Sequence, residues 1–126
     1  MRYMLMIYGS DEAWNALDQV AIDRISAAHK ALQRELAAFG ELVDHKELAL
    51  EGATIVRKEQ GKTVSNRGPF TEGRQVLGGY YLVDCTGLDR AVEIASRFVE
   101  AEFAPIEIRR LGGDTTWDAG APTTSH

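Results

Sequence analysis

The chain has 126 residues, of which 44% are hydrophobic and 26% are charged. This length and composition fit one globular domain with a single core and exclude a disordered chain. The formal charge of −5 argues against a nucleic-acid or anionic-membrane surface, because both need a positive field. We therefore expect small molecules or protein partners, with no nucleic acid and no membrane among them.

The N-terminal run YMLMIY and the single cysteine set the expected compartment. The run is much too short to cross a membrane, and it lacks the basic leader and cleavage site of a signal peptide. We therefore expect a cytoplasmic protein. Cys85 excludes an internal disulfide, and no second thiol exists to begin a zinc cluster. It lies at a predicted strand end, where a buried and inert thiol is expected.

The first third of the chain predicts a strand followed by helix. Residues 2–8 form a strand that Gly9 ends, and both of its faces are apolar. Residues 11–39 change to a helical period, as a short helix and a longer one that starts near Asp18. Gly40 ends the longer helix. Its buried stripe is predicted to contain His29 together with Ile22, Ile25, Leu32, Leu36 and Phe39.

The middle of the chain predicts a series of strands. Residues 41–50 and 53–59 form two of them, with Glu51-Gly52 as a tight connection. A turn at Gly61-Lys62 leads to another extended piece through Ser65. The loop 66–75 contains Pro69, which has no donor for a central ladder. Strand 77–84 follows, apolar on both faces, and its glycines 78 and 79 indicate close backbone packing or a bulge.

The C-terminal part predicts a second helix and a last strand. Residues 86–99 open with Thr86 and Asp89 as a capping box. The predicted buried side of this helix consists of Leu88, Ala91, Val92, Ala95, Phe98 and Val99. Strand 106–111 alternates apolar and charged residues, so one of its faces is expected to be exposed to solvent. Residues 112–126 are expected to be a flexible tail, although Trp117 could dock on a neighbouring element.

The order of these elements predicts the fold class. Strand, helix, strands, helix, strand is the ferredoxin-like split βαβ arrangement, an α+β domain over residues 1–111 whose helices cover one face of an antiparallel sheet. The helix-free face is also apolar, so we expect a second copy to cover it. The expected assembly is a homodimer or higher oligomer in the form of a dimeric α+β barrel. Alternatively, an ordinary patch lies under the tail, formed by Met4, Met6, Tyr8, Tyr81 and Val83.

A resemblance supports this fold. The run GPFTEGRQVLGGYYLVDCTGLDRAVEIASRF, followed by IEIRRL, resembles the DGPF or YCII-related family, and the match extends weakly to YMLMIYG. The matching positions are Gly68, Pro69, Phe70, Glu72, Leu77, Gly78, Gly79, Tyr80 and Tyr81. The resemblance implies a dimeric ferredoxin-like α+β barrel. It implies little about a reaction, although a few relatives resemble enzymes that dechlorinate or isomerise ring compounds without a cofactor.

One position departs from the family pattern. Arg67 stands where the family has the Asp of its turn, so a general base or metal ligand is lost there. A guanidinium suited to a carboxylate or phosphate is gained, and Arg74 could join it. Alternatively, both arginines are solvated loop charges that pair with Glu72. The sequence predicts no metal site and no cofactor, because the neighbours Asp44 and His45 face opposite ways on a strand.

His29 is the leading candidate for chemistry. Its place in the predicted stripe directs the imidazole at the sheet, and an imidazole changes protonation near neutral pH. A histidine eleven residues before Gly40 resembles the YCII branch, in which that residue is regarded as a candidate acid-base group. Alternatively, His29 is a core histidine bonded to a carbonyl or tyrosine hydroxyl. The candidate partners are Tyr8, Tyr80, Tyr81, Asp44 and Glu72.

Two functions remain open from the sequence. The first is a binding module that holds a small aromatic or anionic molecule in a pocket between sheet and helices. Its candidate binding residues are Arg67, Phe70, Glu72, Arg74, Tyr80 and Tyr81. The second is a cofactor-free proton-transfer enzyme, an isomerase or dehydrochlorinase-like lyase, in which His29 moves a proton and an arginine stabilises negative charge. The lost turn carboxylate favours the first.

The family resemblance also bears on partners. Family members often occur alongside alternative sigma factors, so a regulatory association is conceivable by family analogy. No residue of this sequence indicates one.

Overall fold

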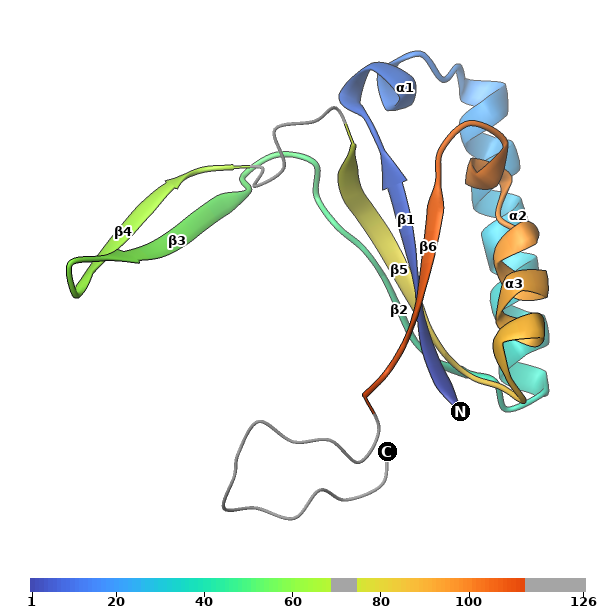
Figure 1. The fold of residues 1–126 in the computed structure, drawn as a ribbon. Coiled ribbons are helices and arrows are strands. Elements are labelled where there is room, and N and C mark those ends of the chain that lie inside the picture. Colours follow the sequence, from blue (N-terminus) through green and yellow to red (C-terminus); the bar gives the residue numbers. More distant parts are fainter. Residues whose placement is uncertain (69–74, 113–126) are drawn as a thin grey trace.

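The computed structural model describes residues 1–68 and 75–112 (Figure 1). The elements, in chain order, are β1 (Arg2–Gly9), α1 (Asp11–Asn15), α2 (Gln19–Ala38), β2 (Leu42–Glu47), β3 (Thr54–Glu59), β4 (Lys62–Arg67), β5 (Val76–Asp84), α3 (Leu88–Ser96), the 3₁₀ helix η1 (Val99–Glu102) and β6 (Ile106–Arg110). The predictions for Phe70, Glu72, Arg74 and Trp117 fall outside the described residues.

The main sheet has four antiparallel strands in the order β2-β5-β1-β6. Figure 1 shows α2 and α3 side by side on one face of this sheet. This is the ferredoxin-like α+β fold that the sequence predicts. We call the helix-free side of the four-stranded sheet the open face.

The strand register decides which side chains enter the core. Tyr3, Leu5 and Ile7 of β1 are buried against the helices, whereas the residues between them are half-buried on the open face. Leu5 pairs with Tyr81, and Tyr3 pairs with Val83. Tyr81 and Val83 are therefore core residues, and the predicted patch that placed them beside Met4, Met6 and Tyr8 is wrong. Tyr80 and Leu82 occupy the open face instead.

Helix α2 is bounded as its sequence predicts, but its buried stripe is shorter. The Asp18 carboxylate accepts from the N–H of Ala21 at 2.8 Å, and Gly40 beyond the last turn has φ +72°. Leu32 and Leu36 are buried and Ile25 is half-buried. The prediction is wrong for Ile22 and Phe39, which are 44% and 67% exposed. Ile22 lies in the first turn of α2, and Phe39 is the C-cap residue that follows its last turn.

Helix α3 departs from the prediction at its start and on one flank. Gly87 is the N-cap without any side-chain cap bond, so the predicted capping box is wrong. The buried side does contain Ala91, Ala95, Phe98 and Val99, and it also contains Ile94, which is fully buried. Leu88 and Val92 are about half exposed, at 55% and 50%. The buried stripe runs through Ala91, Ile94 and Phe98, which places Val92 beside it and Leu88 at the exposed first turn.

Strands β3 and β4 form a separate two-stranded sheet. The turn between them has positive φ at Gln60 and Gly61, close to the predicted turn. The predicted tight connection at Glu51-Gly52 is wrong, because β2 ends at Glu47 and pairs with β5, whereas β3 pairs with β4. Figure 1 shows this hairpin projecting from the domain on the side of the open face.

The pair Gly78-Gly79 of β5 forms a bulge and also allows a close backbone approach, the two roles that the sequence predicts. Ile7 pairs with Gly79 and Tyr8 pairs with Leu77, so Gly78 is the extra residue of a bulge. A Cβ at Gly79 would lie 3.1 Å from the carbonyl oxygen of Lys46. A side chain at this position would therefore press on the backbone of β2 and loosen its pairing with β5.

Candidate functional site

His29 lies between two side chains that come from distant parts of the chain. Its Nδ1 is 2.6 Å from the hydroxyl of Tyr81 on β5. Its Nε2 is 2.9 and 2.7 Å from the two carboxylate oxygens of Glu100 on η1. Helix α2 therefore carries the imidazole, the sheet supplies a phenol, and the 3₁₀ helix after α3 supplies a carboxylate.

Two further side chains extend this arrangement towards β2. The Gln33 amide nitrogen donates to the Tyr81 hydroxyl at 3.1 Å. The same nitrogen lies 3.3 Å from Nδ1 of His45. Gln33 is one helical turn after His29, so both reach the same strand. We call His29, Gln33, His45, Tyr81 and Glu100 the histidine network.

The Glu100 carboxylate fixes the direction of its own hydrogen bond with His29, and the hydrogen bonds of Tyr81 indicate that of the second. Burial raises the pKa of Tyr81 to about 12, so its hydroxyl stays protonated at neutral pH. Because that oxygen accepts from Gln33, its proton is free to be donated to Nδ1 of His29. Nε2 of His29 then carries the ring proton and donates it to Glu100. The Glu100 carboxylate, which can only accept, therefore places a ring proton on Nε2.

The network is enclosed by the core. Tyr81 is 3% exposed and Glu100 is 5% exposed, whereas the side chain of His29 retains 17%. The Phe98 ring packs 4.7 Å from that of Tyr81 and 5.5 Å from that of His29. Glu100 is the buried charged residue of the described ranges. Its negative charge is therefore compensated by hydrogen bonds from the imidazole rather than by water.

The structure brings one of the three candidate tyrosines to His29, whereas Tyr8 and Tyr80 donate to Glu107 and Asp44 instead. Tyr81 contacts the imidazole, as the sequence allows. Tyr80 faces the open side, where its hydroxyl donates to Asp44 at 3.0 Å and this bond raises its pKa. Arg67 is exposed at the end of β4, in the separate hairpin. Phe70, Glu72 and Arg74 lie outside the described residues.

Sequence reasoning missed two members of the network, Gln33 and Glu100, and a signal was available for Glu100. It stands in the run FVEAEF, directly after the two buried residues Phe98 and Val99. A carboxylate that continues an apolar stripe is a usable signal for a buried partner. The predicted helix ends at residue 99, so the prediction stops just before it.

Asp44 and His45 face opposite sides of the sheet, as predicted. Asp44 accepts from Lys46 at 2.7 Å on the open face, and this bond lowers the pKa of its carboxyl. His45 meets Gln33 on the helix side. Within residues 1–68 and 75–112, no group of three or more His, Cys, Asp or Glu side chains is placed to hold a metal ion.

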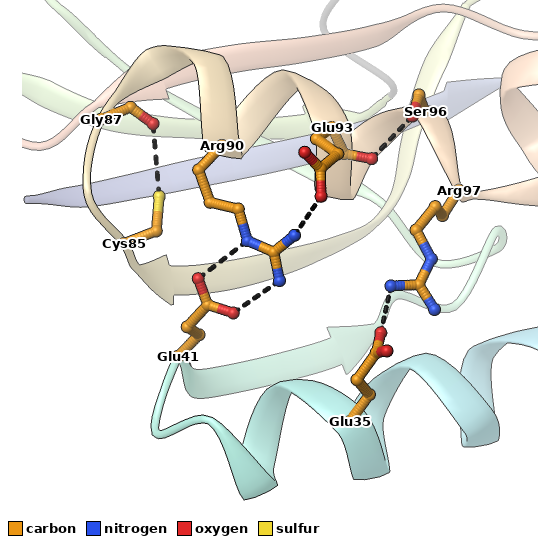
Figure 2. Close-up of polar contacts among 8 residues, drawn as sticks. All are labelled: Glu35, Glu41, Cys85, Gly87, Arg90, Glu93, Ser96 and Arg97. Carbon is orange, nitrogen blue, oxygen red and sulfur yellow. Dashed lines mark hydrogen bonds and ion pairs between the residues drawn. The ribbon is translucent and has the colours of Figure 1, made fainter.

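A separate concave site lies where α2, β5 and α3 meet at one end of the sheet. It is a depression of about 620 Å³ that is open to solvent and is lined by Phe39, Glu41, Asp84, Cys85, Thr86 and Arg90. Figure 2 shows Arg90 held by Glu41, through bonds of 3.0 and 2.7 Å, and also by Glu93. The guanidinium is thus already neutralised by two carboxylates. Cys85 is buried beside it, as predicted, with its Sγ 3.5 Å from the Gly87 carbonyl oxygen.

No helix in the described part of the chain is both long and apolar enough to span a membrane.

Comparison with known sequences places this fold in a family. The chain is 30% identical over 96 residues to an uncharacterised protein, R00369, of Rhizobium meliloti (strain 1021), covering 75% of this chain and 77% of that protein. The YCII-related domain matches residues 1–111. With a match that spans the strands, the helices and the histidine network, the chain belongs to the YCII-related family.

Proposed function

We propose that the protein is a cofactor-free proton-transfer enzyme that binds a small aromatic or anionic molecule and uses His29 as its acid-base group. The observation that supports this most directly is the buried Glu100 carboxylate on Nε2 of His29. The reaction class is isomerisation or elimination on a ring compound. Binding without reaction is the second candidate function.

The burial of Glu100 is difficult to explain by stability alone. Taking a carboxylate out of water costs several kcal/mol, and well-packed apolar residues in place of a buried ion pair are often as stabilising. A carboxylate on one nitrogen of an imidazole fixes the tautomer and stabilises the protonated ring that a base becomes. The pair therefore suits His29 to accept a proton at Nδ1.

Tyr81 suits a complementary role. A substrate carbon that displaces the Tyr81 hydroxyl from Nδ1 would lose its proton to the imidazole, and its electrons would move onto a neighbouring oxygen. The Tyr81 hydroxyl remains protonated, because its pKa is about 12, and can donate to that oxyanion. A positioned base of this kind contributes roughly 10²- to 10⁴-fold in rate.

The test compares two carboxylates of the same 3₁₀ helix. Glu100→Gln and His29→Gln should each lower turnover by at least about 100-fold on chlorinated hydroquinones or ring lactones, measured as chloride release or by NMR. Glu102→Gln is the control, because Glu102 is 57% exposed and pairs with Arg24. Unchanged turnover in both network variants would contradict the proposed enzyme function. Saturable binding without turnover in the wild type would leave a binding module.

The open face supports a homodimer. Its two central rows read Asp44, Leu82, Met4, Arg109 and Lys46, Tyr80, Met6, Glu107 across the four strands. Each row is apolar in the middle and carries opposite charges at its ends, and the order of charge is reversed between the rows.

This pattern is complementary to itself. A half-turn about an axis along the strands places Asp44 over the partner's Arg109 and Lys46 over the partner's Glu107. A half-turn about an axis across the strands places Asp44 over the partner's Lys46. Each arrangement buries the four central side chains against the central side chains of the second copy and sets unlike charges together, as an isologous interface allows.

The homodimer is tested with two variants, each of which places a lysine on a different face of the domain. Leu82→Lys on the open face should give the mass of one chain by light scattering at micromolar concentration. Val92→Lys is the matched control, because Val92 is half exposed on α3, on the helix side. A dimer that survives Leu82→Lys, or a wild type with the mass of one chain, would contradict the proposal.

A further inference from the structure

The β3–β4 hairpin lies apart from the domain that carries it. Its two strands pair with each other from Thr54–Arg67 to Glu59–Lys62, in a sheet of their own. An isolated two-stranded hairpin is only marginally stable in water and gains stability when a face packs on another element. This hairpin therefore needs something to pack against.

One face of the hairpin is entirely exposed. Alternation along the strands places Val56 at its centre, and the residues around it are Thr54, Lys58, Thr63, Ser65 and Arg67. All six are exposed, and Val56 is 64% exposed. The other face holds Ile55 and Val64, which are half-buried. The face of Val56 is thus a β-branched apolar centre with a cation at either end.

The hairpin differs in charge from the rest of the chain. Residues 54–67 contain four cations, Arg57, Lys58, Lys62 and Arg67, and one anion, Glu59, for a net charge of +3. The whole chain carries −5, which leaves −8 on the other residues. A second copy therefore presents an acidic body to this hairpin, and a nucleic acid would be repelled by that body.

The hairpin also points in the direction where a second copy would lie. Figure 1 shows it on the side of the open face, away from α2 and α3. Strands of six residues reach about 20 Å, which is enough to pass beside a domain packed on the open face. The same chain cannot offer its own helices to the hairpin, because its sheet lies between them.

We propose that the β3–β4 hairpin is an arm that docks through the face of Val56 on the acidic body of a second copy of this chain. The proposal rests on the homodimer inferred above. In this arrangement the hairpin of each chain packs against the other chain. The unlike charges of arm and body strengthen an interface whose centre is the open face.

Sedimentation equilibrium of the full chain tests the contribution of the arm. Val56→Glu and Lys58→Glu should each raise the dimer dissociation constant at least about tenfold at low salt, with the effect of Lys58→Glu shrinking at high salt. Lys30→Glu, an exposed site on α2, is the matched control for the added charge. Circular dichroism confirms that each variant is folded. Unchanged dissociation constants in both arm variants would overturn the proposal that the hairpin docks on a second copy.

A second measurement locates the contact. A nitroxide attached through Val56→Cys, in a chain with Cys85→Ser, is mixed with a ¹⁵N-labelled chain that carries no label. Broadened amide signals in the ¹⁵N chain report a contact between copies, and an absence of broadening would overturn the arm. If the wild type sediments as a single chain, the homodimer itself fails. Binding of the wild type to a nucleic-acid duplex through the hairpin would also overturn the proposal.

Discussion

Nε2 of His29 lies 2.7 Å from a carboxylate oxygen of Glu100, 71 residues later in the chain. The contact joins the middle of α2 to the 3₁₀ helix that follows α3, and only 6% of the Glu100 side chain is exposed. Because Tyr81 occupies the other imidazole nitrogen, all the polar atoms of the ring are bonded to side chains. This geometry gives the network measurable effects on stability as well as on chemistry.

Removal of one partner from this pair should cost more than removal of both. His29→Leu leaves the Glu100 carboxylate buried without a donor, and we expect a loss of about 3–5 kcal/mol in the free energy of unfolding. The double variant with Glu100→Leu should recover part of that loss, because it removes the stranded charge. Urea unfolding at one fixed protein concentration measures both. A double variant less stable than His29→Leu would contradict this account.

The raised pKa of Tyr81 predicts a loss of stability in alkali. Tyr81 titrates at about 12 when folded and near 10.0 when unfolded. The unfolded chain therefore releases this proton first, so the stability present below pH 10 should fall by about 2–3 kcal/mol as the pH rises to 12. Tyr81→Phe should lack this component while sharing the titration of every other group. Parallel alkaline slopes for wild type and variant would refute the assignment.

Two arginines of α3 and its C-terminal end offer a graded comparison (Figure 2). Arg90 and Glu41 are largely buried, with side chains 21% and 14% exposed, whereas Arg97 and its partner Glu35 are 42% and 40% exposed. Arg90→Met should cost about 1.5–3 kcal/mol, and Arg97→Met at most about 1 kcal/mol. Thermal and urea unfolding measure the difference. Equal losses at the two sites would show that burial does not decide the strength of these pairs.

The contribution of Arg90 to the free energy of unfolding should also depend on pH in the acid range. The bond from Arg90 lowers the pKa of Glu41 below 4.5, so its stabilisation is present above that value and is lost as the pH falls through the folded pKa. The gap in stability between wild type and Arg90→Met should therefore narrow as the pH falls below 4.5 and close below the folded pKa of Glu41. A gap that stays constant into acid would assign the loss to packing of the Arg90 stem.

Gly9 should not tolerate a methyl group. A Cβ there would clash with Nε1 of Trp14, whose ring packs edge-on against Phe103 at 5.7 Å. We expect Gly9→Ala to displace the indole, to cost about 1–3 kcal/mol and to shift the Trp14 emission to longer wavelength. Trp117→Phe supplies a background with one tryptophan. Gly87→Ala is the control, because no atom lies within 4 Å of its Cβ, and an unshifted Gly9→Ala spectrum would contradict the expectation.

The site was predictable only in part, and its members show why. Helical spacing places His29 with Leu32 and Leu36, so the direction of its imidazole follows from the sequence. Tyr80 and Tyr81 lie in a strand that is apolar on both faces, so period two cannot tell which of them enters the core. The antiparallel pairing of Leu5 with Tyr81 decides it.

The sequence by itself determined the order of the elements, the ferredoxin-like class, the family and the direction of the His29 side chain, because each follows from local period or from residues at fixed spacing. Only the tertiary structure decided that β2 pairs with β5 instead of β3 and that Glu100 reaches His29. Such contacts join segments far apart in the chain, and they depend on how helices and strands pack against one another. Local patterns do not contain that information.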